Sequence, residues 1–546
     1  MAKPSLSISR FAPHLLCGLA ALCHVRAQAQ KPRSEPICPL PAAMQNELRL
    51  HPGASNRQKA GAWFESHKNY ACATQEYRAA TKAEPQSAQH WLLLGASLSS
   101  AGALKEAESS FRHATSIAPE GPQGHELLAS LLDQLRRADE AETEWKTALN
   151  LNRNSVVALH GLAQHLLARG NYAGAVKLLQ DAPVNNEAIA LDLINAYGKG
   201  GSLLEAENTA KKALEQLPSS FPLTQTLAGI LVDLGKFKEA ISLTDEFATA
   251  HHENLAAQRL LLHLLFTGND LERAKPVAQT LLSRLPLDPF VLYVNGTLER
   301  QAGNYAGART HLERSIALDP SLDDAHYNLG LALSKLNDRA GARKEFEKSL
   351  ALADHDPEVH FQLSRVLRSL GEQDKADKQL QLFRDATEEQ SRRSVAQSKA
   401  IAAEKELTGG DANKAVTLYN EALQETPDDA LLDFKLAMAL DKTGDTKAER
   451  VALEKAVQID PAMAIAQNQL GYLAVRSGDS ATAEEHFRDA VRAAPAYAEA
   501  WVNLAATLAM ESKIPEAQRA VESALKADPD NANAIQLQKE LSSESH

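Results

Sequence analysis

Apolar and polar positions recur along this chain with a period of 34 residues. Residues 88–121 read AQHWLLLGASLSSAGALKEAESSFRHATSIAPEG, and residues 464–497 read AIAQNQLGYLAVRSGDSATAEEHFRDAVRAAPAY. The matching residues are Leu94, Gly95, Ala107, Phe111, Ala114 and Pro119 in the first segment and Leu470, Gly471, Ala483, Phe487, Ala490 and Pro495 in the second. A period of this length is typical of arrays that repeat one supersecondary unit.

The same register extends over residues 54–531 and defines fourteen repeats, which we number 1 to 14. They start at residues 54, 88, 122, 156, 187, 221, 255, 289, 323, 357, 396, 430, 464 and 498. Repeat 4 is three residues short, and five extra residues, 391–395, follow repeat 10. Position 20 is alanine in every repeat except repeat 12, which has Glu449, and position 32 is proline in nine repeats.

Each recurring position has a physical role in a helix–turn–helix hairpin, whose two helices we call helix A and helix B. A small residue at position 8, such as Gly61 or Gly330, and the alanine at position 20 allow the helices to approach closely. Glycine at position 15 suits a left-handed residue at the end of helix A, and proline at position 32 ends helix B. Because such a hairpin buries its apolar face only against its neighbours, the pattern predicts an all-α array.

The ends of the array and its insertion differ from the repeats. Residues 30–53 combine a Pro-rich stretch up to residue 41 with a short capping helix over 42–51, and residues 532–546 contain a polar closing helix and a tail. Residues 391–395 separate repeats 1–10 (54–390) from repeats 11–14 (396–531). They either lengthen helix B of repeat 10 and divide the array into 54–390 and 396–546, or form a tolerated surface insertion, which we favour.

Residues 1–29 predict a cleaved secretory signal peptide. Lys3 and Arg10 give it a positive start, residues 11–23 are apolar, and small residues precede the cut near Ala29-Gln30. An N-terminal membrane anchor is the alternative, but the apolar stretch is too short to span a bilayer comfortably. We therefore expect a periplasmic or secreted protein.

The mature chain is expected to be acidic. The 546 residues carry a formal net charge of −12, which becomes −15 without residues 1–29, because three basic residues and no acidic residue leave. This charge disfavours binding to nucleic acids. No later segment is apolar for long enough to cross a membrane, so no transmembrane segment is expected in the mature chain.

Two cysteines, Cys38 and Cys72, remain after the expected cut. In an oxidising compartment they predict one disulfide between the N-terminal segment and the first repeat; two unrelated thiols are the alternative. Two cysteines are too few for a metal cage, and we expect neither a metal nor another cofactor.

The repeat resembles the tetratricopeptide repeat family. That family's motif has a large residue, then Leu-Gly, in helix A, followed by Ala, a large residue, Ala and Pro in helix B, and residues Trp91 to Pro119 match it closely. The resemblance covers residues 54–531 and implies a right-handed α-solenoid that binds other polypeptides. The motif residues themselves are structural in the family, so they do not identify the partner.

The resemblance also implies a partner-binding groove lined by positions 2, 5, 9, 12 and 13 of helix A. In repeats 7–10 these positions hold an aromatic and basic set: Arg259, His263, Phe266, Phe290, Tyr293, Arg300, Tyr327, Lys335, Phe361, Arg365 and Arg368. Aromatic and arginine side chains dominate interface energies, and guanidinium groups suit the carboxylates of an acidic peptide. The alternative is that the aromatics pack between neighbouring A helices while the arginines are solvated. A second, weaker set comprises Phe434, Met438, Tyr472, Arg476 and Met510.

Enzyme signatures are weak in this sequence. It has no glycine-rich phosphate loop and no nucleophile elbow, and the His251-His252-Glu253 run lies where histidine often caps a helix end. We therefore predict no catalytic residues and a scaffold that binds proteins or extended peptides, for envelope assembly, secretion or polysaccharide export. Carbohydrate binding through Phe290, Tyr293, Tyr327 and Phe361 is the second hypothesis, and an enzyme is a remote third.

Overall fold

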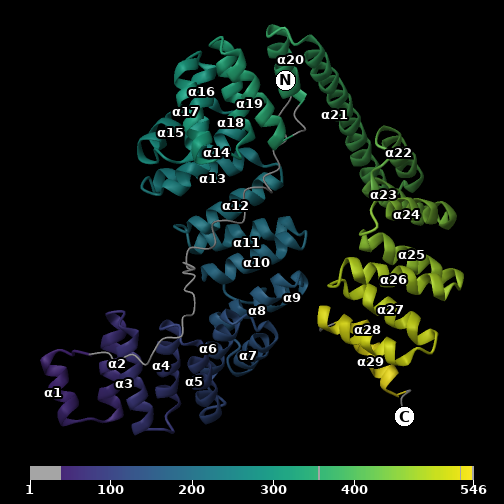
Figure 1. Ribbon diagram of the computed structural model, residues 1–546. Coiled ribbons are helices and arrows are strands. Elements are labelled where there is room, and N and C mark those ends of the chain that lie inside the picture. The colour runs from purple at the N-terminus through teal and green to yellow at the C-terminus, as the bar shows by residue number, and fades with distance from the viewer. Residues whose placement is uncertain (1–37, 354–356, 529–530, 544–546) are drawn as a thin grey trace. The chain divides into compact units, whose positions relative to one another are not determined.

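The computed structural model describes residues 38–353, 357–528 and 531–543, and within them the chain is α-helical with no β-strand (Figure 1). The expected signal peptide, residues 1–29, lies outside the described residues. Helix A of thirteen repeats is a separate helix: α2 (Ala54–Ser66), α4 (Ala88–Ser100), α6 (Pro122–Gln134), α8 (Val156–Ala168), α10 (Glu187–Lys199), α12 (Phe221–Asp233), α14 (Leu255–Thr267), α16 (Pro289–Gln301), α18 (Asp323–Lys335), α20 (Pro357–Ser369), α23 (Ala430–Thr443), α25 (Ala464–Ser477) and α27 (Ala498–Met510).

Helix B follows after a short turn in each repeat. These helices are α3 (Tyr70–Ala83), α5 (Leu104–Ile117), α7 (Ala138–Leu151), α9 (Tyr172–Leu179), α11 (Leu203–Gln216), α13 (Phe237–Ala250), α15 (Leu271–Arg284), α17 (Tyr305–Leu318), α19 (Arg339–Leu352), α22 (Ala412–Glu425), α24 (Thr446–Ile459), α26 (Ser480–Ala493) and α28 (Ile514–Ala527). Three further helices are α1 (Ala42–Leu50), α21 (Gln373–Thr408) and α29 (Ala532–Ser543). The three residues missing from repeat 4 shorten its helix B, α9.

The turn between helices A and B has the same backbone form in every repeat. Position 15 has φ between 57° and 90° in all fourteen repeats, and glycine occupies it in nine of them. The other five carry Lys68, Arg136, Asn269, Asn337 and Ser512 in the same left-handed conformation. The fold therefore imposes this conformation even where a side chain makes it unfavourable.

Close approach at position 8 sets the spacing of the two helices. A Cβ atom on Gly330 would lie 2.6 Å from the ring of Phe346, and one on Gly471 would lie equally close to the ring of Phe487. Both phenylalanines occupy position 24 and are almost completely buried. In these two repeats the ring on helix B thus leaves no room for a Cβ atom opposite it on helix A.

The chain divides into two compact units, whose boundary lies between Arg153 and Asn154. The first contains α1 and repeats 1–3. Here the sulfur atoms of Cys38 and Cys72 are joined in a disulfide, which ties the segment before α1 to the buried start of α3. The second unit contains repeats 4–14 and α29, so its boundary does not coincide with the insertion.

Residues 391–395 lie in the middle of one continuous helix, α21, of 36 residues. This helix serves as helix B of repeat 10 and continues as helix A of repeat 11. The five residues are exposed, as a surface insertion would be, but they lengthen the helix that begins as helix B of repeat 10, which was the other interpretation. Position 32 of repeat 10 is Glu388 rather than proline, so nothing there ends the helix.

Glu449 takes the place of the alanine at position 20 in repeat 12. It is completely buried, its Oε1 accepts a hydrogen bond from Gln469 (3.1 Å), and its Oε2 has no partner. Burial raises the pKa of this carboxyl above its ordinary value, Asp441 adds to the rise, and Gln469 and Arg476 oppose it. Repeat 12 therefore carries a buried acid at position 20, where the other repeats have alanine.

We expect Glu449→Gln to stabilise the protein near neutral pH by about 1–2 kcal/mol, because an unsatisfied buried charge is costly. The pKa of Glu449 is higher in the folded state than its ordinary value of 4.5. The free energy of unfolding of the wild type therefore decreases as the pH rises from 4.5 through the pKa of the folded state. The advantage of the variant should thus be absent below pH 4.5 and grow above it. Urea unfolding at several pH values measures this difference; an advantage independent of pH would contradict it.

Candidate functional site

The candidate site is the surface formed by positions 2, 5, 9, 12 and 13 of helix A in repeats 7–10, which we call the A-helix face. Its side chains come from α14, α16, α18 and α20, all within the second compact unit. Figure 1 shows these helices among α13 to α20 in teal and green.

Aromatic rings on α14 and α16 pack against one another. The ring centres of His263 and Phe290 are 5.4 Å apart, those of Phe266 and Tyr293 are 5.5 Å apart, and those of Phe290 and Tyr293 are 6.3 Å apart. Burial raises the pKa of the Tyr293 hydroxyl and lowers the pKa of His263, so His263 is held neutral. These four rings form a layer between two neighbouring A helices, and they contribute to the packing of the array.

Arg259 is also engaged within the fold. Its Nε donates to Oδ2 of Asp288 at 2.7 Å, and its guanidinium carbon lies 5.0 Å from the ring centre of Phe290. Asp288 is the N-cap of α16, where its Oδ1 accepts from the backbone N–H of Val291. The charge of Arg259 is therefore already matched by the acid that caps helix A of the next repeat.

Arg300 differs from Arg259 because no acidic side chain pairs with it among the described residues. Its Nε donates to the neutral Oδ1 of Asn328 at 2.9 Å, and Asn328 in turn donates to the backbone oxygen of Asp324. Burial lowers the pKa of Arg300, while the nearby hydroxyls of Tyr327, Tyr293 and Tyr305 oppose that shift. The result is a partly buried guanidinium whose side-chain hydrogen bond goes to a neutral amide.

The remaining predicted residues lie at the far end of this face. Phe361 packs on Phe383 of α21, with ring centres 5.2 Å apart, and Arg365 lies over Phe361 at 5.9 Å. Arg368 pairs with Asp377 at 3.1 Å. Lys335 is exposed at the end of α18. Arg365 and Lys335 thus add accessible positive charge beyond Arg300, whereas the charge of Arg368 is matched by Asp377.

The second set of predicted residues, in repeats 12–14, is more exposed. Tyr472 is 49% exposed and Met510 is 68% exposed, and Arg476 lies 5.8 Å from the ring centre of Tyr472. Phe434 and Met438 are partly buried. By exposure, this set offers more free apolar surface than the layer on α14 and α16.

Other chemistry is sparse in the part of the chain that the structure describes. No group of three or more His, Cys, Asp or Glu side chains there could hold a metal ion. His251 and His252 each lie near Glu253, at 3.8 and 3.7 Å. None of the helices in this part combines the length and the apolar character that crossing a membrane requires.

Sequence reasoning missed one recurrent feature, a polar pair between positions 4 and 23 of the same repeat. Five repeats contain it: Arg57–Glu76, His125–Glu144, His326–Glu345, His360–Gln379 and Gln467–His486, with atoms 2.6–2.8 Å apart. A search for polar partners 19 residues apart in the aligned repeats would have found it.

Family models of one kind match several segments of the chain. Models described as tetratricopeptide repeat match residues 66–122, 127–188 and 402–464, residues 323–356 and residues 474–541, and a model described as TPR repeat matches residues 296–337. A search of curated proteins finds no match.

Two solved structures match the chain at low sequence identity and low TM-score. The APC/C hetero-tetramer Cut9–Hcn1 matches with 14% identity over 91% of this chain and 92% of that chain, at a TM-score of 0.34. The structure of Naa15/Naa10 bound to HypK-THB matches with 15% identity over 90% and 96%, at a TM-score of 0.26. The repeat register, the helical hairpins and the family models together show that this chain is a tetratricopeptide repeat protein.

Proposed function

We propose that this chain is a protein-binding scaffold and that the A-helix face around Arg300 receives an acidic group of its partner. A scaffold that binds other polypeptides is the function that the repeat architecture supports. The observation that carries the finer proposal is Arg300, a partly buried guanidinium without an acidic partner among the described residues.

Desolvation makes Arg300 a strong candidate for a carboxylate contact. A guanidinium that has already lost part of its water has less hydration to give up on binding. Its planar set of N–H donors can hold a carboxylate through two parallel hydrogen bonds. Lys335 and Arg365, both exposed, add attraction for a negative segment that continues along the face.

Arg300→Gln should weaken binding of an acidic peptide by about ten-fold or more, because it removes a charge-assisted hydrogen bond worth roughly 1.5–3 kcal/mol. The probe is a fluorescein-labelled peptide of alternating glutamate and leucine, and its glutamine counterpart serves as the neutral reference. Anisotropy titrations at low and high salt measure the affinity, which should fall as salt rises.

Arg309→Gln is the matched control, because Arg309 lies on helix B of the same repeat and pairs there with Glu313 at 2.7 Å. This variant should bind like the wild type. Equal affinity of the wild type and Arg300→Gln for the acidic peptide would contradict the site, and equal affinity for both peptides would contradict the acidic partner.

Export is part of the proposal. It rests on the signal-like residues 1–29, and the Cys38–Cys72 disulfide is consistent with an oxidising compartment, where such bonds persist. In the periplasm or outside the cell, a scaffold of this kind would serve envelope assembly, secretion or polysaccharide export. Fractionation of cells that produce the full chain, with N-terminal sequencing of the product, tests for a cut near Ala29.

Carbohydrate binding gains no support from the aromatic layer. Stacking on a sugar needs an accessible ring face, and the rings of Phe290 and Tyr293 pack against each other and against α14.

A further inference from the structure

Repeat 12 lacks the polar pair between positions 4 and 23 that five other repeats contain. Its position 4 is Asp433, but its position 23 is Ala452, a methyl group that can neither donate nor accept a hydrogen bond. Lys455, at position 26, reaches across instead, with Nζ 3.1 Å from Oδ1 and 3.0 Å from Oδ2 of Asp433. Asp433 is only 2% exposed, and its Oδ2 forms an ion pair with Lys455 but accepts no hydrogen bond.

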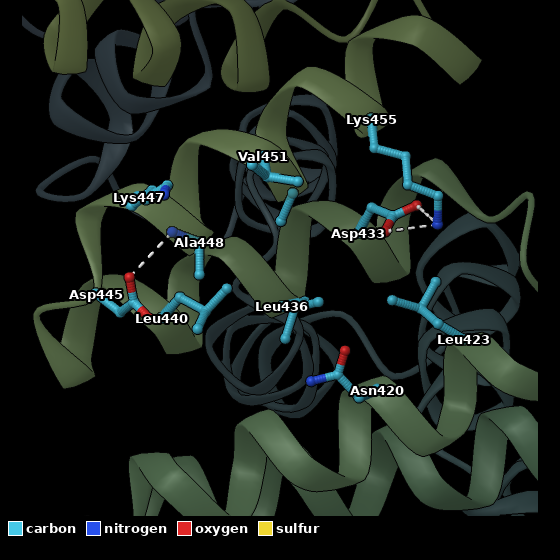
Figure 2. Close-up of a pocket in the computed structure, with 11 residues that line it drawn as sticks. Asn420, Leu423, Asp433, Leu436, Leu440, Asp445, Lys447, Ala448, Val451 and Lys455 are labelled. Atoms are coloured by element: carbon cyan, nitrogen blue, oxygen red, sulfur yellow. Dashed lines mark hydrogen bonds and ion pairs between the residues drawn. The ribbon is translucent and has the colours of Figure 1, made fainter.

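A cavity of about 530 Å³ lies where the pair is missing (Figure 2). It is bounded by α22, α23 and α24. Leu423, Leu436 and Leu440 contribute apolar wall, and Figure 2 shows Asp433 with Lys455 at one end and Asp445 at the other. The cavity thus combines an apolar body with a buried carboxylate at one end.

The equivalent place in repeat 9 provides an internal comparison. There the cavity between α17, α18 and α19 measures about 230 Å³, and Glu345 lies in its wall, paired with His326 at 2.6 Å. Position 22 is Lys344 in repeat 9 and Val451 in repeat 12, and position 23 is Glu345 in repeat 9 and Ala452 in repeat 12. In repeat 9, which has the pair, the space is smaller; in repeat 12, which lacks it, the space is larger and its wall is more apolar.

We propose that the repeat 12 cavity is a binding site for a histidine or arginine side chain of a partner polypeptide, flanked by apolar residues. The chain itself shows which groups complement a carboxylate at this place. In repeats 1, 3 and 9 the carboxylate at position 23 is met by a planar N–H donor at position 4, namely Arg57, His125 or His326. In repeat 13 the histidine stands at position 23 itself, as His486, and its partner at position 4 is the neutral amide of Gln467.

Lys455 does not fill this role completely. It is a flexible point charge, its side chain is 43% exposed, and it leaves Oδ2 of Asp433 without a hydrogen bond. Burial raises the pKa of Asp433 in spite of this lysine. An incoming imidazole or guanidinium would supply the missing donor while Lys455 turns towards solvent, and the leucines would contact the residues beside it.

The test uses the full mature chain and three fluorescein-labelled tripeptide amides, leucine–X–leucine, in which X is arginine, histidine or glutamine. Two variants probe the site. Asp433→Asn removes the charge, and Ala452→His places an imidazole donor at position 23, in the part of the cavity beside Asp433. Asp441→Asn is the control, because it makes the same chemical change on α23 outside the cavity. Circular dichroism and thermal melting establish that each variant is folded.

The arginine or histidine peptide should bind the wild type and the Asp441→Asn control about ten-fold more tightly than the glutamine peptide. Ala452→His and Asp433→Asn should abolish this preference. The proposal is overturned if the wild type binds none of the peptides, if it binds all three equally, or if the preference survives in Ala452→His. Because histidine already stands at position 23 in repeat 13, as His486, Ala452→His is expected to fold and decides the question even if Asp433→Asn does not fold.

Discussion

Phe487→Ala is expected to lower the free energy of unfolding of the C-terminal repeats by about 3–5 kcal/mol, as large-to-small changes in a well-packed core do. Phe487 is 1% exposed and lies in one apolar cluster with Leu504, Leu508 and Val521. Its ring also covers Gly471, which has no side chain to fill the space that would be left. The loss in the free energy of unfolding should therefore lie near the upper end of this range.

Urea unfolding followed by circular dichroism, with hydrogen exchange of α25 to α27, measures this loss. Phe434→Ala is the matched control. Phe434 lies on the neighbouring α23 and is only partly buried, so its removal should lower the free energy of unfolding much less. Equal losses in the two variants would mean that position 24 has no special role. Because an array of repeats need not unfold in one step, the hydrogen-exchange data assign the loss to its repeats.

Cys38→Ser should reduce the stability of α1 and the first repeat by about 3 kcal/mol, since the lost disulfide spans 34 residues of sequence and constrains the unfolded chain. No residue of α1 is buried, so this helix depends on the covalent link. Hydrogen exchange of α1 and α3 should therefore become faster in the variant.

Reduction provides the control for this prediction. Dithiothreitol should reproduce the faster exchange in the wild type and change nothing further in Cys38→Ser. If the reductant left exchange in α1 and α3 unchanged in the wild type, the disulfide would have no part in holding this end of the chain.

Much of the fold follows from the sequence because each repeat imposes the same local rules. Helix A begins at the first residue of thirteen repeats, and helix B begins at position 17 of thirteen, with α21 beginning there in repeat 10. The left-handed turn was visible in the nine glycines, but Lys68 and Arg136 adopt it as well. A lengthened helix B of repeat 10 was only the less favoured interpretation, because the lack of a proline at Glu388 removes a stop signal but does not show that helix B continues into helix A of repeat 11.

The candidate site was less predictable because helical position indicates which way a side chain points, not what covers it. The register placed Phe266 and Tyr293 on the A-helix face, but their mutual contact depends on the spacing of α14 and α16. Similarly, the register places both Arg259 and Arg300 on the A-helix face. Only the structure shows that Arg259 pairs with Asp288, whereas Arg300 donates a hydrogen bond to Asn328. The cavity beside Ala452 exists because position 23 of repeat 12 has no large side chain, and the repeat motif does not specify the residue at that position.

The long helix α21 affects how cooperatively the array unfolds. In a linear array each repeat is stabilised by its nearest neighbours, and a disturbance spreads only as far as those interfaces carry it. None of the residues 377–395 of α21 is buried, whereas Ala376 and Ala396 at either side are. The thermodynamic link between repeats 10 and 11 therefore passes through helical backbone hydrogen bonds instead of packed side chains. Repeats on the two sides can open separately while the helix that joins them persists, so a change that loosens repeat 12 need not reach the face around Arg300.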